Sequence, residues 1–426
     1  MRRPRWFKEG FLMKAPGESK ILCIWIGLGL VAAAGLAGEI RRIEFPNPTA
    51  PIRLAEGLLK GADDATWGLS KIPGVEVKVI YRANKETGTF VNHPQLAVFK
   101  GRMYTGFQLC PANEDSTDSV AVYSSSEDMN TWSLPRVIGP LVGDETFRAS
   151  VGWLQDEQRL YALMLRRDDM PPGKVTVTEY CVSRDGESWT EPQVLIPDMM
   201  GSANGRRISP DGRMLLFGHG SRLKDGECWL ENSVYYNDGS DLTVHWQEAT
   251  CPREMLYYGS ANQPMARGTE SDWYRCPDGR LVMVSRDIVR AGYILACVSD
   301  DQGASWTQPL LTNIPDSSNM QCAGNLPDGT CFVVTTPGPV HIKNDNLQPR
   351  TPLVLWLSSD GEVFDRAFLI RSTPPTRRFE GKSKTAGYSY AGTLVHDGYL
   401  YISYATNKED IEMSCIPLNE LKKNDL

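Results

Sequence analysis

One stretch decides the fold of this chain: Ser299-Asp300-Asp301-Gln302-Gly303-Ala304-Ser305-Trp306. Its Ser and Asp side chains can bond the backbone of a tight turn, its Gly can take a dihedral that other residues resist, and its Trp can pack beneath the turn. Copies lie at 126–132, 183–189 and 358–364, and a weaker one is Asn237-Asp238-Gly239 with Trp246. The shared aspartates are 53 to 63 residues apart, which indicates a repeated structural unit: Asp128, Asp185, Asp238, Asp301 and Asp360.

A second repeat runs in phase with the first. It consists of two apolar runs joined by a short polar turn, most often Asp-Gly, which favours positive φ at both central residues and matches the twist of paired strands. Each copy therefore predicts a β-hairpin. The six copies span 93–107, 150–165, 208–218, 273–285, 323–335 and 392–404. Helical patterns are scarce, and only 54–59 and 418–423 favour a short helix.

The turn pattern S-x-D-x-G-x-x-W resembles the Asp box, or BNR repeat, of the sialidase superfamily. The resemblance covers about residues 65–415 and implies an all-β fold, a six-bladed β-propeller. We place the propeller at 65–417, after an N-terminal extension at 39–64 and before a tail at 418–426. Asp boxes lie at the outer edges of blades, and they occur in receptors and lyases as well as in hydrolases. They therefore predict the fold and leave the reaction open.

The first 38 residues are expected to be a targeting segment. Residues 21–38 carry no charge, follow Lys14 and Lys20, and end in a run of small residues. This pattern is typical of a cleaved secretory signal, and its length would also suit an uncleaved membrane anchor. We therefore expect a secreted or periplasmic protein, or one anchored by this segment.

Charge and cysteine content exclude some partners. Residues 1–38 hold six Lys or Arg and two Glu, so the remaining chain has a formal net charge of −11. An acidic protein repels nucleic acid, and an acidic ligand would need a local group of arginines. Nine cysteines remain after residue 38, with no C-x-x-C or H-x-H pattern, so we expect no metal and no cofactor. The sequence does not indicate an oligomeric state.

The candidate site follows from the expected fold. The first strand of each blade lines the central axis, and function in such folds lies in loops and strand ends at one mouth. The sialidase resemblance implies a Tyr nucleophile activated by Glu, an Asp acid/base and three arginines that bind a carboxylate. On this basis the catalytic candidates are Tyr388, Tyr390, Asp272, Glu270 and His93. The candidates for substrate binding are Arg148, Arg206, Arg378, Glu380 and Gln321.

One departure from the family pattern affects the expected reaction. Sialidases carry a Phe/Tyr-Arg-Ile-Pro motif on the first inner strand, and the segment aligned by its turn is Val91-Asn92-His93-Pro94. Asn92 stands at the Arg position, and His93 offers a neutral base or a hydroxyl-binding group. Arg286, Asp287 and Arg290 follow the second strand of the fourth hairpin and either line the same face or face solvent.

Three functions remain open from the sequence. The first is an exo-glycosidase of sialidase-like type acting on a terminal acidic sugar. The second is a polysaccharide lyase acting at a uronic acid, with His93 or a Tyr abstracting a proton and an Arg stabilising the enolate. The third is a non-catalytic glycan-binding propeller. All three have a glycan or oligosaccharide as partner.

Overall fold

The computed structural model describes residues 42–43, 49–60, 65–114, 116–139, 146–168, 175–210, 212–224, 227–252, 257–258, 268–288, 290–338 and 349–422. The predicted signal or anchor at 1–38, and Asp211 of the third predicted turn, lie outside these residues. Among the described residues, no helix is both long and apolar enough to cross a membrane.

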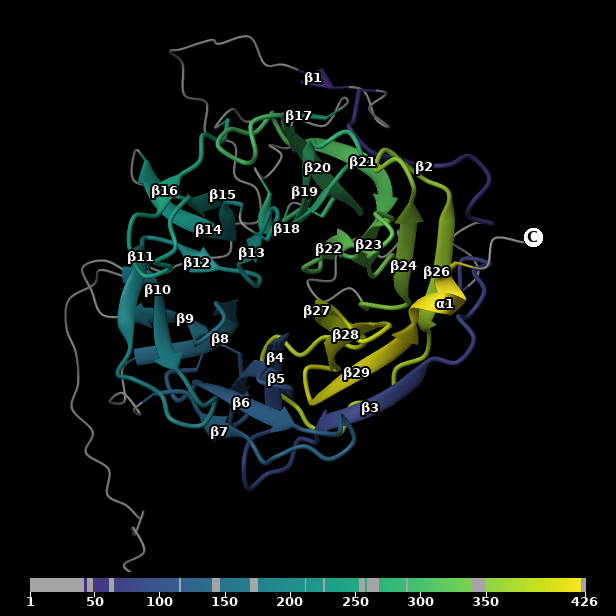
Figure 1. Ribbon diagram of the computed structural model, residues 1–426. Helices are drawn as coiled ribbons and strands as arrows, with labels where there is room; N and C mark the ends of the chain where they lie inside the picture. The colour runs from purple at the N-terminus through teal and green to yellow at the C-terminus, as the bar shows by residue number, and fades with distance from the viewer. Residues whose placement is uncertain are drawn as a thin grey trace, which may run out of the picture. The chain divides into compact units, whose positions relative to one another are not determined.

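Six antiparallel sheets, called blades, follow one another around a ring in chain order (Figure 1). Blade 1 contains β4 (Phe90–Phe99), β5 (Arg102–Cys110), β6 (Val120–Ser126) and β7 (Arg136–Val137). Blade 2 contains β8 (Thr146–Gln155), β9 (Leu160–Asp168), β10 (Val175–Ser183) and β11 (Gln193–Pro197). Blade 3 contains β12 (Met200–Gly201), β13 (Arg206–Arg207), β14 (Met214–Lys224), β15 (Glu227–Asn237) and β16 (Gln247–Glu248).

The second half of the ring has the same construction. Blade 4 contains β18 (Thr269–Arg275), β19 (Leu281–Arg286), β20 (Tyr293–Ser299) and β21 (Leu310–Pro315). Blade 5 contains β22 (Cys322–Asn325), β23 (Cys331–Thr335), β24 (Leu353–Ser358) and β26 (Arg366–Arg371). Blade 6 contains β27 (Tyr388–His396), β28 (Tyr399–Thr406), β29 (Asp410–Pro417) and β3 (Glu76–Tyr81). The predicted all-β, six-bladed propeller is confirmed.

The remaining elements are short. β1 (Arg42–Ile43) pairs with β17 (Tyr257–Tyr258), and β2 (Arg53–Leu54) pairs with β25 (Val363–Phe364). The helix predicted at 418–423 is present as α1 (Leu418–Leu421). The helix predicted at 54–59 is wrong, because this segment forms β2 and a turn, and Ile52 and Leu54 enter the apolar core shared by blades 4 and 5.

The Asp boxes form the turns that the sequence predicts. In each of the four clear copies, the Asp carboxylate accepts a hydrogen bond from the hydroxyl of the box Ser, at 2.8 to 3.1 Å. It also accepts backbone N–H groups further along the turn, as Asp185 does from Glu187 and Ser188, both at 2.8 Å. These bonds satisfy the turn backbone locally, so each box can end a blade without help from another element.

The glycines of these boxes let neighbouring blades approach closely. Gly186 and Gly361 have φ of 77° and 78°, which favours glycine. A Cβ on Gly186 would lie 1.9 Å from the Tyr104 hydroxyl of blade 1, and one on Gly361 would lie 2.6 Å from the Cys276 sulfur of blade 4. Each of these boxes therefore packs on the preceding blade, which gives the box a structural role.

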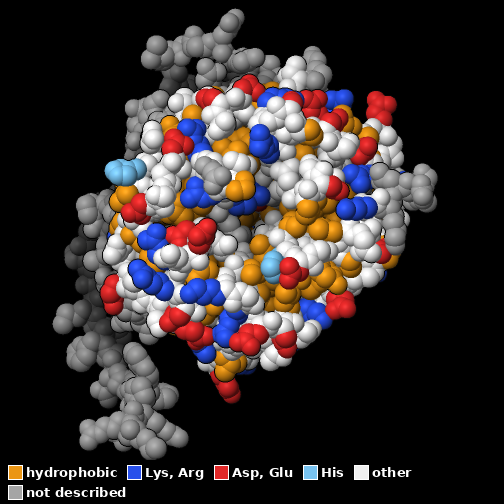
Figure 2. Space-filling view, viewed as in Figure 1, with side chains coloured by type: hydrophobic (Ala, Val, Ile, Leu, Met, Phe, Trp, Pro, Cys, Tyr) orange, Lys and Arg blue, Asp and Glu red, His pale blue; other side chains and the backbone are white. Residues whose placement is uncertain are grey.

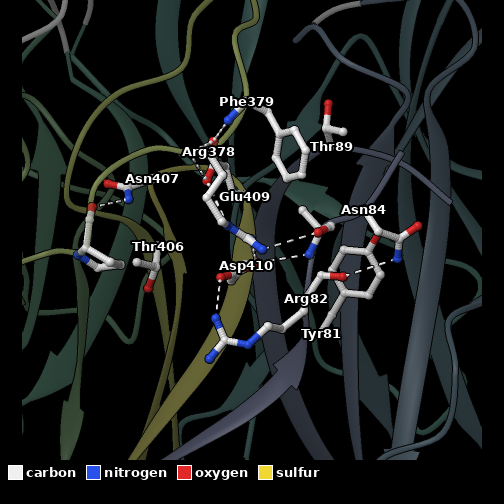
Figure 3. Close-up of polar contacts among 12 residues, drawn as sticks. Tyr81, Arg82, Asn84, Thr89, Arg378, Phe379, Thr406, Asn407, Glu409 and Asp410 are labelled. Atoms are coloured by element: carbon white, nitrogen blue, oxygen red, sulfur yellow. Dashed lines mark hydrogen bonds and ion pairs between the residues drawn. The ribbon is translucent and has the colours of Figure 1, made fainter. Parts of the chain in front are cut away.

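The ring is closed by pairing the N-terminal strand with the last one. β3 lies antiparallel to β29 and completes blade 6. Asp410, at the start of β29, accepts the backbone N–H of Ala83 at 2.9 Å and pairs with Arg82 at 3.1 Å and with Arg378. Figure 3 shows both guanidinium groups directed at this carboxylate. Asp410 thus joins the end of β3 and the loop before β27 to the last blade.

The surface shows no broad area of one charge on the face seen in Figure 2, where Lys, Arg, Asp and Glu side chains of the described residues are interspersed. A hollow lies at the centre of the ring on this face. The axis of the ring is therefore the natural place to look for a site, because side chains from all blades can meet there.

We expect Asp410→Asn to destabilise the protein by about 2 kcal/mol, because it leaves two guanidinium groups without their shared carboxylate. The measurement is the free energy of unfolding from urea denaturation. Asp397→Asn is the matched control, since the Asp397 side chain is 78% exposed in the hairpin turn of the same blade. Equal stability of the two variants would show that the charge of Asp410 does not contribute to ring closure.

Candidate active site at the ring axis

The inner strands of four blades contain a shift of the pairing register; in β8 of blade 2 it lies between Ser150 and Gly152, and in three other blades it carries a strained residue. The pairing register shifts between Asn92 and Gln95 in β4, between Thr269 and Asp272 in β18, and between Ser389 and Gly392 in β27. At these bulges lie three residues with positive φ: His93 at 55°, Glu270 at 51° and Tyr390 at 55°. Such conformations are strained for residues other than glycine, and they cluster at functional sites.

The bulges bring these three side chains together. Tyr390 Oη donates to Glu270 Oε1 at 3.1 Å, and the rings of His93 and Tyr390 have centroids 4.1 Å apart. Arg286 at the end of β19 donates from Nη1 to Glu270 Oε2 at 2.7 Å and to Tyr390 Oη at 3.1 Å. Together with Arg350, these four residues form a group that we call the axial site.

Arg350 and a second cation lie against Tyr390. The Arg350 guanidinium lies 5.0 Å from the centroid of the Tyr390 ring, and Lys408 Nζ lies 5.4 Å from it. Lys408 also pairs with Glu114 at 2.7 Å, and Asn92 Nδ2 donates to the same Glu114 oxygen at 3.0 Å. With Arg286 and Glu270, three positive side chains and two carboxylates therefore surround one tyrosine.

The backbone fixes the loops that carry these cations. The Arg350 carbonyl accepts the N–H of Tyr388 at 2.7 Å, which attaches Arg350 to the start of β27. Lys408 lies in the turn between β28 and β29, has φ of 54°, and its carbonyl accepts the N–H of Val91 in blade 1 at 3.0 Å. Asn319, in the connection between β21 of blade 4 and β22 of blade 5, accepts the N–H of Tyr390 on its Oδ1 at 3.1 Å. Blades 1, 5 and 6 therefore position the site jointly.

The protonation states follow from burial and neighbouring charge. Burial opposes ionisation of Glu270, but the charge and hydrogen bond of Arg286, together with His219 and His93, outweigh it and lower the pKa of Glu270 to about 2. Burial and the Glu270 carboxylate raise the pKa of Tyr390 above its ordinary value. Burial lowers the pKa of His93 to about 4. At neutral pH the axial site thus contains a carboxylate, a phenol and an uncharged imidazole.

Several buried polar atoms at the axis lack a hydrogen-bond partner among the described residues. They are His93 Nδ1, His219 Nδ1, Arg350 Nη1 and Asn92 Oδ1. His219, on β14, lies close enough to Glu270 for their charges to interact, which opposes the lowering of the His219 pKa by burial. Buried polar atoms are normally hydrogen-bonded, so unpaired ones gathered at one place indicate a polar ligand or water.

Among the predicted catalytic residues, the structure groups Tyr390, Glu270 and His93. Tyr388 lies on the other face of β27, where it is fully buried with its ring centroid 5.3 Å from that of Tyr404. Asp272 accepts the N–H groups of Trp273 and Ala323, both at 2.9 Å, and pairs with Arg206. These contacts engage Asp272 at the junction of blades 3, 4 and 5.

The predicted substrate-binding residues are dispersed. Arg148 pairs with Glu179 inside blade 2 at 3.0 Å, and Arg206 is paired with Asp272. Arg378 pairs with Asp410 and Glu409 at the ring closure (Figure 3). Glu380 has a side chain that is 94% exposed. Gln321 donates to Asp316 at 3.1 Å and also to the carbonyl of Asn319, the residue that holds the Tyr390 backbone.

Sequence reasoning did not find Arg350, Lys408, Glu114 and His219 as site residues. For Arg286 the sequence did not decide whether the side chain lines the axial face or faces solvent. The pairing register of the hairpin could have decided this, because Arg286 pairs with Thr269, which is next to Glu270. Arg350, Lys408 and Glu114 lie in connections between strands, where no periodic pattern marks the direction of a side chain. Among the described residues, no group of three or more His, Cys, Asp or Glu side chains is arranged to hold a metal ion.

Fold and site together define a six-bladed propeller with a buried Tyr–Glu pair and arginines at its axis. The chain belongs to the BNR repeat-like domain family, whose profile matches residues 101–402. No curated protein sequence gives a significant match.

Solved structures agree on the fold. A Dyadobacter fermentans protein of unknown function has a TM-score of 0.60 at 18% identity, with 81% of this chain and 100% of that chain covered. Trypanosoma rangeli sialidase in complex with sialic acid has a TM-score of 0.59 at 13% identity, covering 83% of this chain and 60% of that one. The Ruminococcus gnavus intramolecular trans-sialidase, in complex with oseltamivir carboxylate, has a TM-score of 0.56 at 14% identity, covering 82% and 99%.

The lowered pKa of His93 predicts a pH-dependent contribution to stability. Between pH 6.5 and about 4 the unfolded chain protonates this side chain and the folded chain does not, so stability is lost as pH falls through this range. The wild type should lose about 3 kcal/mol more than His93→Asn between pH 7 and pH 4. Asn is chosen because it tolerates positive φ. The prediction would be contradicted if the unfolding free energies of the wild type and His93→Asn changed by the same amount between pH 7 and pH 4.

Proposed function

We propose that the protein is an exo-glycosidase of sialidase-like type that releases a terminal acidic sugar. The observation that carries the proposal is the 3.1 Å hydrogen bond from the Tyr390 hydroxyl to ionised Glu270, with Arg286 bonded to both. This pair matches the Tyr and Glu that the sialidase resemblance implies for the nucleophile and its base. The neighbouring structures include a sialidase bound to sialic acid, which supports a sugar ligand for the same fold.

In this mechanism Tyr390 Oη attacks the anomeric carbon while its proton passes to Glu270 Oε1. An uncharged nucleophile avoids repulsion from the sugar carboxylate, and the positive charge of Arg286 stabilises the developing phenolate. The bond from the anomeric carbon to the leaving oxygen breaks, and a glycosyl–tyrosine intermediate forms. Water then attacks the same carbon and gives a proton to the group that protonated the leaving oxygen. The bond from this carbon to Tyr390 Oη breaks, and the phenolate regains its proton from Glu270.

The sugar carboxylate is assigned to Arg350 and Arg286. Arg350 has a buried Nη1 with no partner among the described residues and lies over the Tyr390 ring, so a carboxylate there would satisfy it. His93 and Asn92 occupy the strand where the family pattern has a third arginine. Because the imidazole is uncharged, this side of the site suits a hydroxyl or amide group of the sugar better than a second anionic oxygen.

Departure of the leaving group needs a proton donor. We assign this role to the Lys408–Glu114 pair, since Lys408 lies against Tyr390 and burial lowers the pKa of its ammonium group. Asp272, a candidate from the sequence for acid/base catalysis, is hydrogen-bonded to the backbone of blade 5. We also propose that the protein acts after export, on the basis of residues 1–38.

We expect Tyr390→Phe to lower kcat by about 10³-fold or more, since it removes the nucleophilic oxygen and leaves the ring in place. The assay measures monosaccharide released from sialosides and from a panel of uronic acid glycosides. Tyr388→Phe is the matched control, because this tyrosine is two residues away and its buried ring packs on Tyr404, outside the group around Glu270. Full activity of Tyr390→Phe would overturn the assignment of the nucleophile.

We expect Arg350→Gln to raise KM for acidic glycosides by about 10- to 100-fold. This factor corresponds to the loss of one charge-assisted hydrogen bond to the sugar carboxylate. KM for a neutral glycoside of the same leaving group should change little. An equal effect on both substrates would show that Arg350 does not bind the carboxylate.

A polysaccharide lyase is the second candidate, and the His93 geometry favours it. An uncharged imidazole with an unpaired Nδ1, packed against the Tyr390 ring, is suited to abstract the proton next to a uronate carboxylate. The same substrate panel separates the two reactions, because a lyase produces an unsaturated uronate with ultraviolet absorbance and a hydrolase does not. Binding of a glycan without any product would indicate the non-catalytic propeller.

A further inference from the structure

Two buried thiols face each other across the junction of blades 4 and 5. Cys276 follows the inner strand β18, and Cys331 begins β23. Cys276 Sγ lies 3.9 Å from the Gly361 carbonyl oxygen, and Cys331 Sγ lies 3.4 Å from the carbonyl oxygen of Arg275, the residue before Cys276. A Cβ built on Gly361 would lie 2.6 Å from the Cys276 sulfur and 3.2 Å from the Cys331 sulfur, so both sulfurs converge on the same point above the blade 5 Asp box.

The backbone around these thiols is held from both sides. Arg275 donates its N–H to Asn325 Oδ1 at 2.9 Å, and Asn325 Nδ2 donates to the Arg275 carbonyl at 2.8 Å. The Tyr274 hydroxyl donates to the Gly361 carbonyl at 2.7 Å. These bonds fix the segment before Cys276 against blade 5, so the two sulfurs are presented to each other by a rigid frame.

We propose that Cys276 and Cys331 form a disulfide that joins blades 4 and 5 when the protein folds in an oxidising compartment. The thiolate of one of these cysteines attacks one sulfur of a low-molecular-weight disulfide, the S–S bond breaks, and one thiol leaves. The thiolate of the other cysteine then attacks the protein sulfur of the mixed disulfide and releases the second thiol. In total, two cysteine thiols are oxidised to one disulfide, and the external disulfide is reduced to two thiols.

Either thiol can make the first attack, because the exchange takes place before these two side chains pack together. In the folded protein, the proximity of the two thiols lowers the pKa of Cys276 and raises the pKa of Cys331. Both residues are buried, at 3% and 0% exposure, so the exchange takes place before the two blades have closed on each other. The bond would then lock blade 4, which supplies Glu270 and Arg286, to blade 5, and Asn319, which holds the Tyr390 backbone, lies in the connection between these two blades.

Refolding of the full chain with oxidised glutathione tests this proposal. Peptide mapping of the unmodified protein should show one linked pair of peptides, containing Cys276 and Cys331, with the loss of two hydrogens. The oxidised protein should melt about 5 °C above the same protein refolded with reducing agent. Free thiols at both positions, or a link between other cysteines such as Cys251 and Cys297, would overturn the proposal.

Variants separate this bond from general oxidation. In Cys276→Ala/Cys331→Ala, the difference in Tm between oxidised and reduced protein should vanish. Cys415→Ala, in β29 of blade 6, removes another buried thiol and should keep the difference. A difference that persists in the double variant would assign the stabilisation to another pair of cysteines. Peptide mapping of the wild type gives the answer even if the double variant does not fold.

Discussion

The pairing of β3 with β29 is the constraint on which the rest of the structure depends. A blade has two sheet faces, and each must be covered by a neighbouring blade, so a row of blades is complete only when the first meets the last. Asp410 reinforces this contact by bonding Ala83, Arg82 and Arg378. Closure is also what gives the axis its site, since His93, Glu270 and Tyr390 come from blades 1, 4 and 6.

Three strained residues lie where the inner strands meet. His93, Glu270 and Tyr390 each occupy a positive-φ bulge, and their neighbours hold them there: Lys408 bonds the strand of His93, and Asn319 bonds the backbone of Tyr390. Strained residues persist only where the surroundings determine them strongly. The outer parts of the blades provide that rigidity, because the Asp boxes hydrogen-bond their own turn backbone. The sequence of the axial loops can therefore vary to suit a ligand.

The electrostatics of the axial site differ from those of a three-arginine clamp. Arg286 is engaged by Glu270 and Tyr390, which leaves Arg350 as the cation with a buried, unpaired donor among the described residues of the axial site. Uncharged His93 and the Lys408–Glu114 pair also lie beside Tyr390. This arrangement fits the proposed ligand, an acidic sugar that presents one carboxylate and a neighbouring polar group.

The sequence by itself determined the fold, because Asp boxes and Asp-Gly hairpins form from neighbouring residues and recur about once per blade. Their number and spacing therefore predict the number of blades. It also pointed to Tyr390, Glu270 and His93, which lie at fixed distances before those turns. It could not decide whether Tyr390 or Tyr388, and whether Glu270 or Asp272, faces the axis. A bulge changes which side chains of a strand share a face, and no residue type in these strands reveals where the bulge lies. Tertiary structure alone decided that Arg350, Lys408 and Glu114 join the site and that Arg148 and Arg378 serve other contacts. Long side chains in loops take their direction from partners distant in sequence, and only ring closure brings those partners together.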